Sequence, residues 1–110
     1  IQNNIMKLTT EELQQKIDSG EKFIVDLYAD WCGPCRMIGP IVEKVAKQLE
    51  EEGSEVNVYK FDIEQDKEMA VRLGVRSIPA IKGFNGGENI TNKIGVITEA
   101  QLLEMVKEVL

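Results

Sequence analysis

Apolar and polar positions follow one another in a pattern that predicts strands and helices in turn along the chain. Residues 23–29 are apolar on both alternating faces except at Asp26, which is typical of a central strand covered on both sides. From about Pro34 the apolar positions recur at helical spacing until Gly53, so we expect one long helix there. A further strand is predicted over residues 56–61. Strand, helix and strand in this order predict two parallel strands with a right-handed crossover.

Shorter elements precede this unit. Thr9–Glu12 has the sequence of a capping box, which predicts a helix that ends at Gly20. Residues 5–8 before it are expected to form a short edge strand. Pro40 lies inside the long helix and is expected to bend it, because proline removes one backbone donor.

The C-terminal half is expected to add a hairpin between two helices. A short helix is predicted over residues 67–73, and strands 81–84 and 90–94 flank the turn residues 85–87. Thr98 with Gln101 forms a second capping box, which opens a last helix. Its inward residues are expected to be Leu102, Leu103, Val106, Val109 and Leu110. The order predicts an α/β fold, with a central mixed five-stranded sheet flanked by four helices on both faces.

Length and composition restrict the class of protein. The 110 residues fit a single domain, residues 1–110, and 43% hydrophobic with 29% charged residues is ordinary for a globular protein. The net charge of −6 argues against nucleic acid as a partner, because no cluster of Lys or Arg offers a surface to phosphates. Apolar stretches of about seven residues are far shorter than the ~20 of a membrane span, so no membrane association is expected.

The N-terminus shows no signal-peptide pattern, so we expect a cytoplasmic location. The chain begins with Ile1 and has no initiator methionine, which leaves a removed export signal and a periplasmic location open. The triplet at residues 89–91 matches a glycosylation acceptor, but such triplets arise by chance.

Cys32 and Cys35 are the only cysteines, and they lie where the central strand ends and the long helix begins. A disulfide closing so short a loop contributes only ~2 kcal/mol, against about 3 for a fifteen-residue loop. The pair therefore points to a reversible two-electron switch rather than to a structural bridge. Two thiolates are half of a structural zinc site, and the chain has no histidine, so no metal is expected. Two unrelated buried cysteines are the remaining alternative.

The junction itself favours a reactive thiol. If Cys32 caps the helix, its sulfur faces N–H groups that have no partner within the helix, and the pKa of the thiol is expected below ~8.5. Pro34 suits the first helical turn, and Gly33 leaves room for another chain to approach the sulfur.

Asp26 stands six residues before Cys32, in the middle of the predicted central strand. A buried charge is costly unless it is paired, so burial should raise the pKa of this carboxyl group. A carboxyl group that titrates near neutral pH can take a proton from a thiol and return it. A hydrogen-bonded structural aspartate is the alternative. Lys60 either neutralises Asp26 or extends outward from its strand.

The motif Trp31-Cys32-Gly33-Pro34-Cys35 after a hydrophobic strand resembles the active-site motif of the thioredoxin family, and the resemblance covers roughly residues 5–110. Further residues in register are Asp26, Pro40, Lys60, Ile78, Pro79 and Gly95. The resemblance implies the thioredoxin fold. It also implies that Cys32 is the nucleophile, that Cys35 resolves the mixed disulfide, and that Asp26 transfers a proton for Cys35 through water.

Pro79 is expected to lie beside the cysteines. From sequence alone its peptide bond would be trans, and the resemblance reverses this to cis. A cis bond would expose the backbone of Ile78 to an extended substrate segment. The docking patch expected around it consists of Trp31, Gly33, Pro34, Ile78, Pro79 and Gly95.

Two positions depart from the family pattern. Tyr28 stands where many thioredoxins have a second tryptophan. Lys82 and Gly83 interrupt a strand that is usually continuous and apolar, and a glycine there often marks a bulge or a close approach of backbones. Arg36 and Asp30 are expected to be solvated charges at the rim of the site.

These observations predict a monomeric, cofactor-free carrier that reduces disulfide-containing substrate proteins. The chain has no nucleotide-binding glycine fingerprint, so a separate thioredoxin reductase is implied, flavin-dependent and NADPH-linked, with ferredoxin-linked supply also open. An exported thiol oxidase or isomerase of the same fold, or a specialised periplasmic reductant, is one alternative. Gly33-Pro34 disfavours the oxidase and the isomerase, because the resemblance implies a histidine between the cysteines of such proteins. A non-catalytic module that only binds a partner protein is the other alternative.

Overall fold

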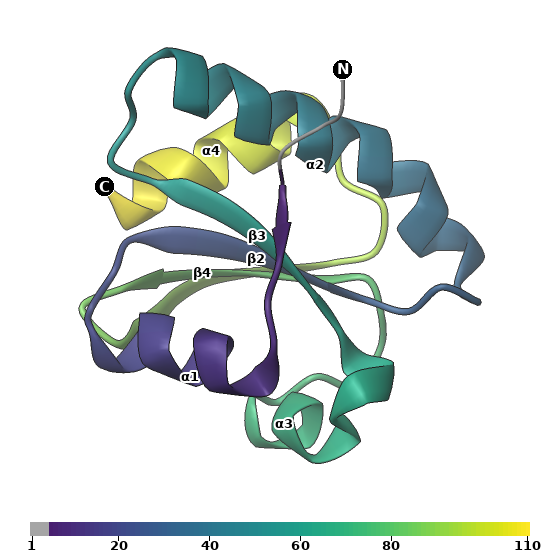
Figure 1. Ribbon diagram of the computed structural model, residues 1–110. Helices are drawn as coiled ribbons and strands as arrows, with labels where there is room; N and C mark the ends of the chain where they lie inside the picture. Colours follow the sequence, from purple (N-terminus) through teal and green to yellow (C-terminus); the bar gives the residue numbers. More distant parts are fainter. Residues whose placement is uncertain (1–4) are drawn as a thin grey trace.

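A five-stranded mixed sheet forms the centre of the molecule in the computed structural model, which describes residues 5–110 (Figure 1). The strand order is β1-β3-β2-β4-β5, so β2 and β3 lie inside the sheet and β1 and β5 form its edges. The strands are β1 (Met6–Lys7), β2 (Phe23–Tyr28), β3 (Asn57–Asp62), β4 (Ala80–Asn85) and β5 (Glu88–Ile94).

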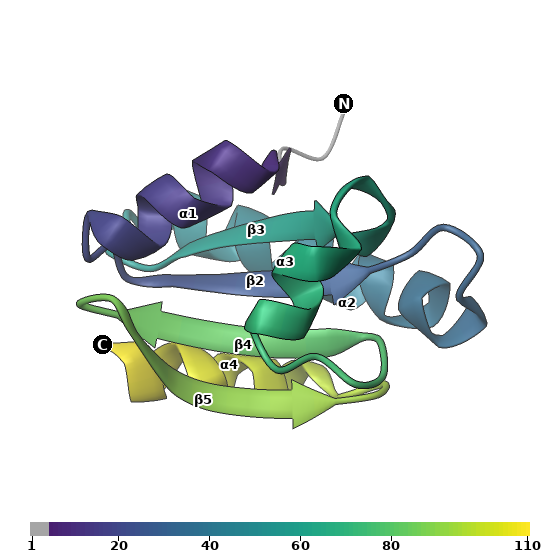
Figure 2. The same ribbon diagram turned by 90° about the horizontal axis from the view of Figure 1, so that it is seen from below.

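Helices cover both faces of the sheet (Figures 1 and 2). One apolar core lies between the sheet and the pair α2 and α4, and a second lies between the sheet and α1 and α3. Within residues 5–110 no helix is both long enough and apolar enough to cross a membrane. The helices are α1 (Thr10–Asp18), α2 (Gly33–Glu51), α3 (Lys67–Arg72) and α4 (Glu99–Val109), with a 3-10 turn η1 (Ile63–Gln65).

The central position of β2 confirms what its apolar pattern predicts. β2 pairs in parallel with β3 and antiparallel with β4. Phe23 to Leu27 are buried, including Asp26. The register places Asp26 opposite Lys60 on one side and Ile81 on the other. The parallel β2–α2–β3 unit therefore places the end of β2 and the start of α2 at the same end of the sheet, where β2 and β3 finish.

Both predicted capping boxes are present. The Thr9 hydroxyl accepts from the backbone N–H of Glu12 at 3.1 Å, and Thr98 does the same for Gln101 at 3.1 Å. One expectation for α4 is wrong: Leu110, expected to point inward, is 60% exposed because it lies beyond the last turn of the helix. Met105 fills the core among the predicted inward residues of α4.

Gly83 lies at an irregularity of the hairpin, as its place in the strand predicted. It pairs with Thr91 while Phe84 pairs with Asn89, so Ile90 is an extra residue in β5. A Cβ atom on Gly83 would lie 2.6 Å from a methyl carbon of Thr91 and 2.6 Å from one of Val109. Both expected reasons for the glycine therefore apply, a bulge and the close approach of α4 to β4.

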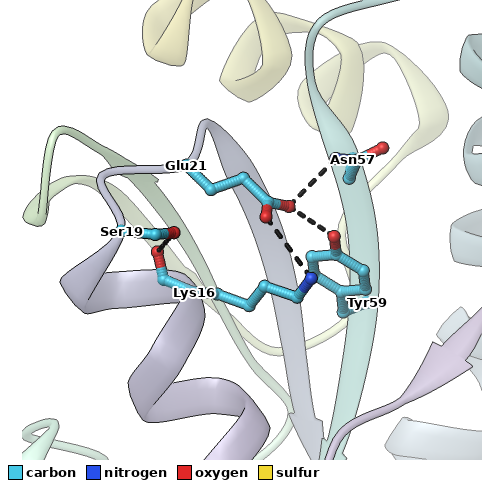
Figure 3. A network of polar contacts seen from close by, with 5 residues as sticks. All are labelled: Lys16, Ser19, Glu21, Asn57 and Tyr59. Carbon is cyan, nitrogen blue, oxygen red and sulfur yellow. Dashed lines mark hydrogen bonds and ion pairs between the residues drawn. The ribbon is translucent and has the colours of Figure 1, made fainter.

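The turn that precedes β2 is held against strand β3 by a network of polar contacts (Figure 3). The Glu21 carboxylate accepts hydrogen bonds from the Tyr59 hydroxyl and from the Asn57 amide at 2.9 Å, and it lies 3.4 Å from the Lys16 ammonium. The same ammonium lies 5.1 Å from the centre of the Tyr59 ring. The Ser19 hydroxyl donates to the Lys16 carbonyl at 3.1 Å. The end of α1 and strand β3 are thereby joined through one carboxylate.

Candidate active site

The two cysteines lie at the first turn of α2, as their place in the sequence predicted. Cys32 is the N-cap of the helix, with extended backbone, and its sulfur accepts the backbone N–H of Cys35 at 3.1 Å. Pro34 stands within the first turn, and no acidic side chain lies there to oppose the positive end of the helix. The structure holds the pair as a disulfide with the Cα atoms 5.2 Å apart.

The surroundings of the two sulfurs differ although their exposure does not, since Cys32 and Cys35 are each 5% exposed. The sulfur of Cys32 lies 3.9 Å from the carbonyl oxygen of Ile78. Cys35 instead lines a cavity of about 500 Å³ together with Asp26 and Lys60. One sulfur is therefore adjacent to the expected docking patch, and the other to the predicted proton-transfer group.

The segment opposite Cys32 is joined to the hairpin. The Ile78–Pro79 peptide bond is cis, as the resemblance implied. The backbone N–H of Gly95 donates to the carbonyl of Pro79 at 2.8 Å. Gly95 has a φ of +88°, a conformation that favours glycine. The entry to β4 and the exit from β5 are thus held together beside the disulfide.

Asp26 is 4% exposed, and its Oδ1 atom has no hydrogen-bond partner within residues 5–110. Burial raises the pKa of this carboxyl group from 3.8 to about 7, and the nearby charge of Lys60 opposes part of that rise. Within residues 5–110, no hydrogen bond therefore offsets the burial of Oδ1. A carboxyl group with this pKa is present in both protonation states at neutral pH.

Lys60 falls between the two alternatives that the sequence left open. It faces Asp26 in the register and lines the same cavity, but no ion pair joins the two side chains within residues 5–110. Its ammonium lies 5.8 Å from the centre of the Tyr28 ring. Lys60 therefore acts on Asp26 through its field rather than through contact.

The docking patch includes one large exposed ring. Trp31 is 66% exposed, and its indole N–H donates to the Glu64 carboxylate at 2.9 Å. A Cβ atom on Gly33 would meet no atom of the described part of the chain within 4 Å, so this side of the disulfide is open there. Pro34 is exposed, Ile78 is half-buried and Pro79 is buried.

Sequence reasoning did not single out several exposed apolar side chains. Met37 and Ile94 are 67% and 66% exposed, and Val71 is 71% exposed. A hollow of about 450 Å³ runs between Trp31 and Ile78 and is lined mostly by apolar side chains. Met37 lies off the apolar stripe of α2, and this position was the sign in the sequence that its side chain would be exposed. Arg36 is exposed and donates to the Asp30 carbonyl at 2.6 Å, which agrees with a rim position.

Two thiols placed within one helical turn can form and lose a bond between them, and each such event moves two electrons. This site, on a sheet of this topology, defines a thiol–disulfide oxidoreductase with the thioredoxin fold.

Comparison with known proteins agrees with this class. The sequence profile of the thioredoxin family matches residues 4–108. Thioredoxin from Rickettsia bellii is 36% identical over 104 residues, 94% of each chain, and thioredoxin 1 from a Nostoc species is 33% identical over 95 residues, 86% of each chain. The structure of a mutant thioredoxin from Halobacterium salinarum superposes with a TM-score of 0.81 at 29% identity, covering 96% of this chain and 89% of that one. The chain belongs to the thioredoxin family, and it carries out dithiol–disulfide exchange through Cys32 and Cys35.

Proposed function

We propose that this protein reduces disulfides in other proteins, with Cys32 as the attacking thiol and Cys35 as the resolving thiol. The observation that carries this assignment is the position of the Cys32 sulfur. It accepts a helix N–H at 3.1 Å and lies 3.9 Å from the carbonyl of Ile78, next to the open side of the site. Helix N–H groups and the helix dipole stabilise a thiolate at this position.

Exchange then proceeds in two steps that balance. The Cys32 thiolate attacks one sulfur of the substrate disulfide, whose S–S bond breaks, and the departing substrate sulfur takes up a proton. The Cys35 thiolate next attacks the Cys32 sulfur and releases the second substrate thiol. The substrate gains two electrons, and the protein keeps the Cys32–Cys35 disulfide.

Asp26 serves the second step as the group that accepts the proton of Cys35. Both residues line the same cavity, and the pKa of Asp26 is about 7. A base is most effective when its pKa is close to the working pH. That cavity, of about 500 Å³, has room for water that could carry the proton. Lys60 adjusts the pKa of Asp26 from across the strands.

Substrates are recognised mainly by shape and backbone. The main chain at Ile78 is available to an extended segment that carries the target cysteine, and such pairing supplies affinity without a sequence code. Trp31, Gly33, Pro34 and Gly95 surround that segment. The substrates are therefore proteins whose disulfides lie in accessible, extended stretches.

The oxidised protein is recharged by a separate thioredoxin reductase, and the protein acts as a monomer in the cytoplasm. Gly33 and Pro34 bring no positive charge that would stabilise the dithiol. For this two-electron couple, about 1.4 kcal/mol corresponds to about 30 mV, so the lack of such a charge makes the pair more reducing. A reducing dithiol suits the compartment in which thiols are kept reduced.

The test is insulin reduction coupled to NADPH and a thioredoxin reductase, with the redox potential measured on the same preparation. Cys32→Ser is expected to abolish both turnover and mixed-disulfide formation. Cys35→Ser is expected to lose turnover but to accumulate the mixed disulfide. No turnover in the parent protein, or a potential well above the roughly −220 to −260 mV of the glutathione pool, would contradict the proposal and favour an oxidase or isomerase. Partner binding that survives loss of both cysteines, without any turnover in the parent, would favour a binding module.

A further inference from the structure

Lys82 is a charged residue on β4, an inner strand of the sheet. It is 8% exposed and pairs with Val25 in the register, so it lies on the face of the sheet that α1 and α3 cover. Its ammonium donates to the side-chain oxygen of Asn92 at 2.8 Å and approaches that of Asn89 at 3.5 Å. Burial lowers the pKa of Lys82. Both partners are uncharged, so the hydrogen bonds are satisfied in part while the charge is not neutralised.

The Asn89 side chain is itself held in place. Its amide donates to the carbonyls of Gly83 at 3.1 Å and Thr91 at 3.2 Å. Gly83 and Thr91 are paired beside the bulge, so these two bonds hold the Asn89 side chain next to the strand that carries Lys82. The hairpin thus orients an amide whose oxygen faces the buried amine.

A hollow of about 290 Å³ opens beside Lys82. The segment between α3 and β4 lines one side of it, and β4 and β5 line the other, including Asn92. Arg76 lines the first side and is exposed, and Lys93 also borders the hollow. Of the residues that the structure describes, no Asp or Glu lines it, although the chain has a net charge of −6. Within residues 5–110, neither Lys82 nor Arg76 forms an ion pair.

This hollow adjoins the one between Trp31 and Ile78, because Val75, Arg76 and Ser77 line both. Ser77 lines it and directly precedes Ile78, and Ile94 lines it and directly precedes Gly95. Lys82 is three positions beyond Pro79, which corresponds to about 10 Å along a strand. In Figure 2 the segment after α3 runs past the ends of β4 and β5 that lie toward the start of α2. An extended segment bound at Ile78 would therefore pass the mouth of the hollow within a few residues.

We propose that this hollow is a carboxylate-binding subsite, which receives an Asp or Glu side chain of the substrate protein a few residues from the cysteine that Cys32 attacks. The inference rests on the proposed function and adds a substrate preference to it. A carboxylate accepts charge-assisted hydrogen bonds from both an ammonium and a guanidinium group, and these are stronger than bonds between neutral groups. It would supply the negative charge that the asparagines beside Lys82 do not.

Matched peptide disulfides test the preference. In each pair a single Glu or Gln stands at one of the positions two to five residues before or after the reacting cysteine, and kcat/KM is measured at constant ionic strength. At one or two adjacent positions the Glu peptide is expected to be reduced about three- to tenfold faster than the Gln peptide, as for a partly buried charge pair. If kcat/KM is the same for the Glu and Gln peptides at every position while insulin is reduced normally, the subsite is overturned and the proposed function stays intact.

Variants assign the preference to the hollow. Lys82→Met is expected to abolish the Glu advantage while the Gln peptides are reduced at the parent rate, and Arg76→Gln, on the surface, is expected to diminish it. Lys107→Met makes the same change of net charge on α4 and is expected to keep the preference. A Glu advantage that survives Lys82→Met and Arg76→Gln, or that Lys107→Met removes equally, would show general attraction and overturn the proposal.

A trapped complex separates a substrate side chain from a free anion. Cys35→Ala holds the mixed disulfide with either peptide, and the Glu complex alone is expected to shift the backbone amide signals of Lys82 and Asn92 in NMR spectra. If succinate or inorganic phosphate shifts the same signals while the two peptide complexes are identical, the hollow serves a free anion and the proposal is wrong. Failure of Cys35→Ala to form any mixed disulfide would instead contradict the assignment of Cys32.

Discussion

Asp26 and Lys60 occupy paired positions on neighbouring parallel strands, yet their side chains form no ion pair within residues 5–110. The lysine lowers the pKa of the aspartate only in part, and burial dominates. An intimate pair would hold Asp26 ionised at every physiological pH. The separation leaves a carboxyl group that changes its protonation state near neutral pH.

Stability is expected to depend on pH through Asp26. Its pKa is about 7 in the folded protein against 3.8 as the ordinary value, so between these values the folded state retains a proton that the unfolded state releases. The free energy of unfolding therefore falls as the pH rises from about 4 to about 7 and stays low above that, by up to about 4 kcal/mol. Asp26→Asn removes this slope and is more stable than the parent at pH 8. Urea unfolding of the oxidised parent and variant at several pH values measures the free energy of unfolding. An unchanged pH slope in the variant would refute the assignment of this slope to Asp26.

Lys60→Gln is expected to raise the pKa of Asp26 above about 7, because it removes the positive charge that opposes the effect of burial. The pH dependence of the resolving step should move upward with it. Carbon-13 NMR of the Asp26 carboxyl group measures the pKa directly. Lys107→Gln, an exposed change of the same charge on α4, is expected to leave the pKa where it is. A pKa that stays the same in Lys60→Gln would remove Lys60 from the mechanism.

Gly83→Ala is expected to destabilise the protein by about 1–3 kcal/mol, because the added methyl group would overlap methyl groups of Thr91 and Val109. A double-mutant cycle provides the control. Val109→Ala removes one of the two methyl groups in the way, so the double variant should be less destabilised than the sum of the single variants. Chemical denaturation of the four proteins measures the coupling, and strict additivity would contradict the close approach of α4.

Tyr59→Phe is expected to cost about 1 kcal/mol of stability, since the Tyr59 hydroxyl donates to the Glu21 carboxylate and both groups are partly buried. Tyr28→Phe is the matched control. The Tyr28 hydroxyl has no hydrogen bond within residues 5–110, so its loss should change stability by less than about 0.5 kcal/mol. Equal effects in the two variants would show that the network around Glu21 contributes nothing.

The features that sequence analysis predicted well are those encoded locally. The capping boxes at Thr9 and Thr98 involve residues three apart, and the burial of Asp26 follows from the apolar residues on each side of it. The position of Cys32 as N-cap follows from the junction of strand and helix. Each of these depends on short-range pattern, which a single sequence contains in full.

The features that it missed join residues far apart along the chain. Glu64, which holds the indole of Trp31, lies in a 3-10 turn without a strong local signal. Asn89 and Asn92 could be placed beside Lys82 only once the hairpin register was known, and the extra residue in β5 shifts that register. Such contacts are set by the tertiary arrangement rather than by neighbouring residues.

The extra residue in β5 also bears on how the molecule meets its own copies. β5 is the long outer strand of the sheet, and an open strand edge is a template on which another chain can pair and aggregate. The bulge at Ile90 interrupts the regular spacing of its backbone groups, and Glu88 and Lys93 place charges beside the interruption. At the other edge, β1 is only two residues long. The sheet thus ends on both sides in edges that resist further growth. A protein whose redox site must stay accessible to other chains therefore does not also offer them an open strand edge on which to pair.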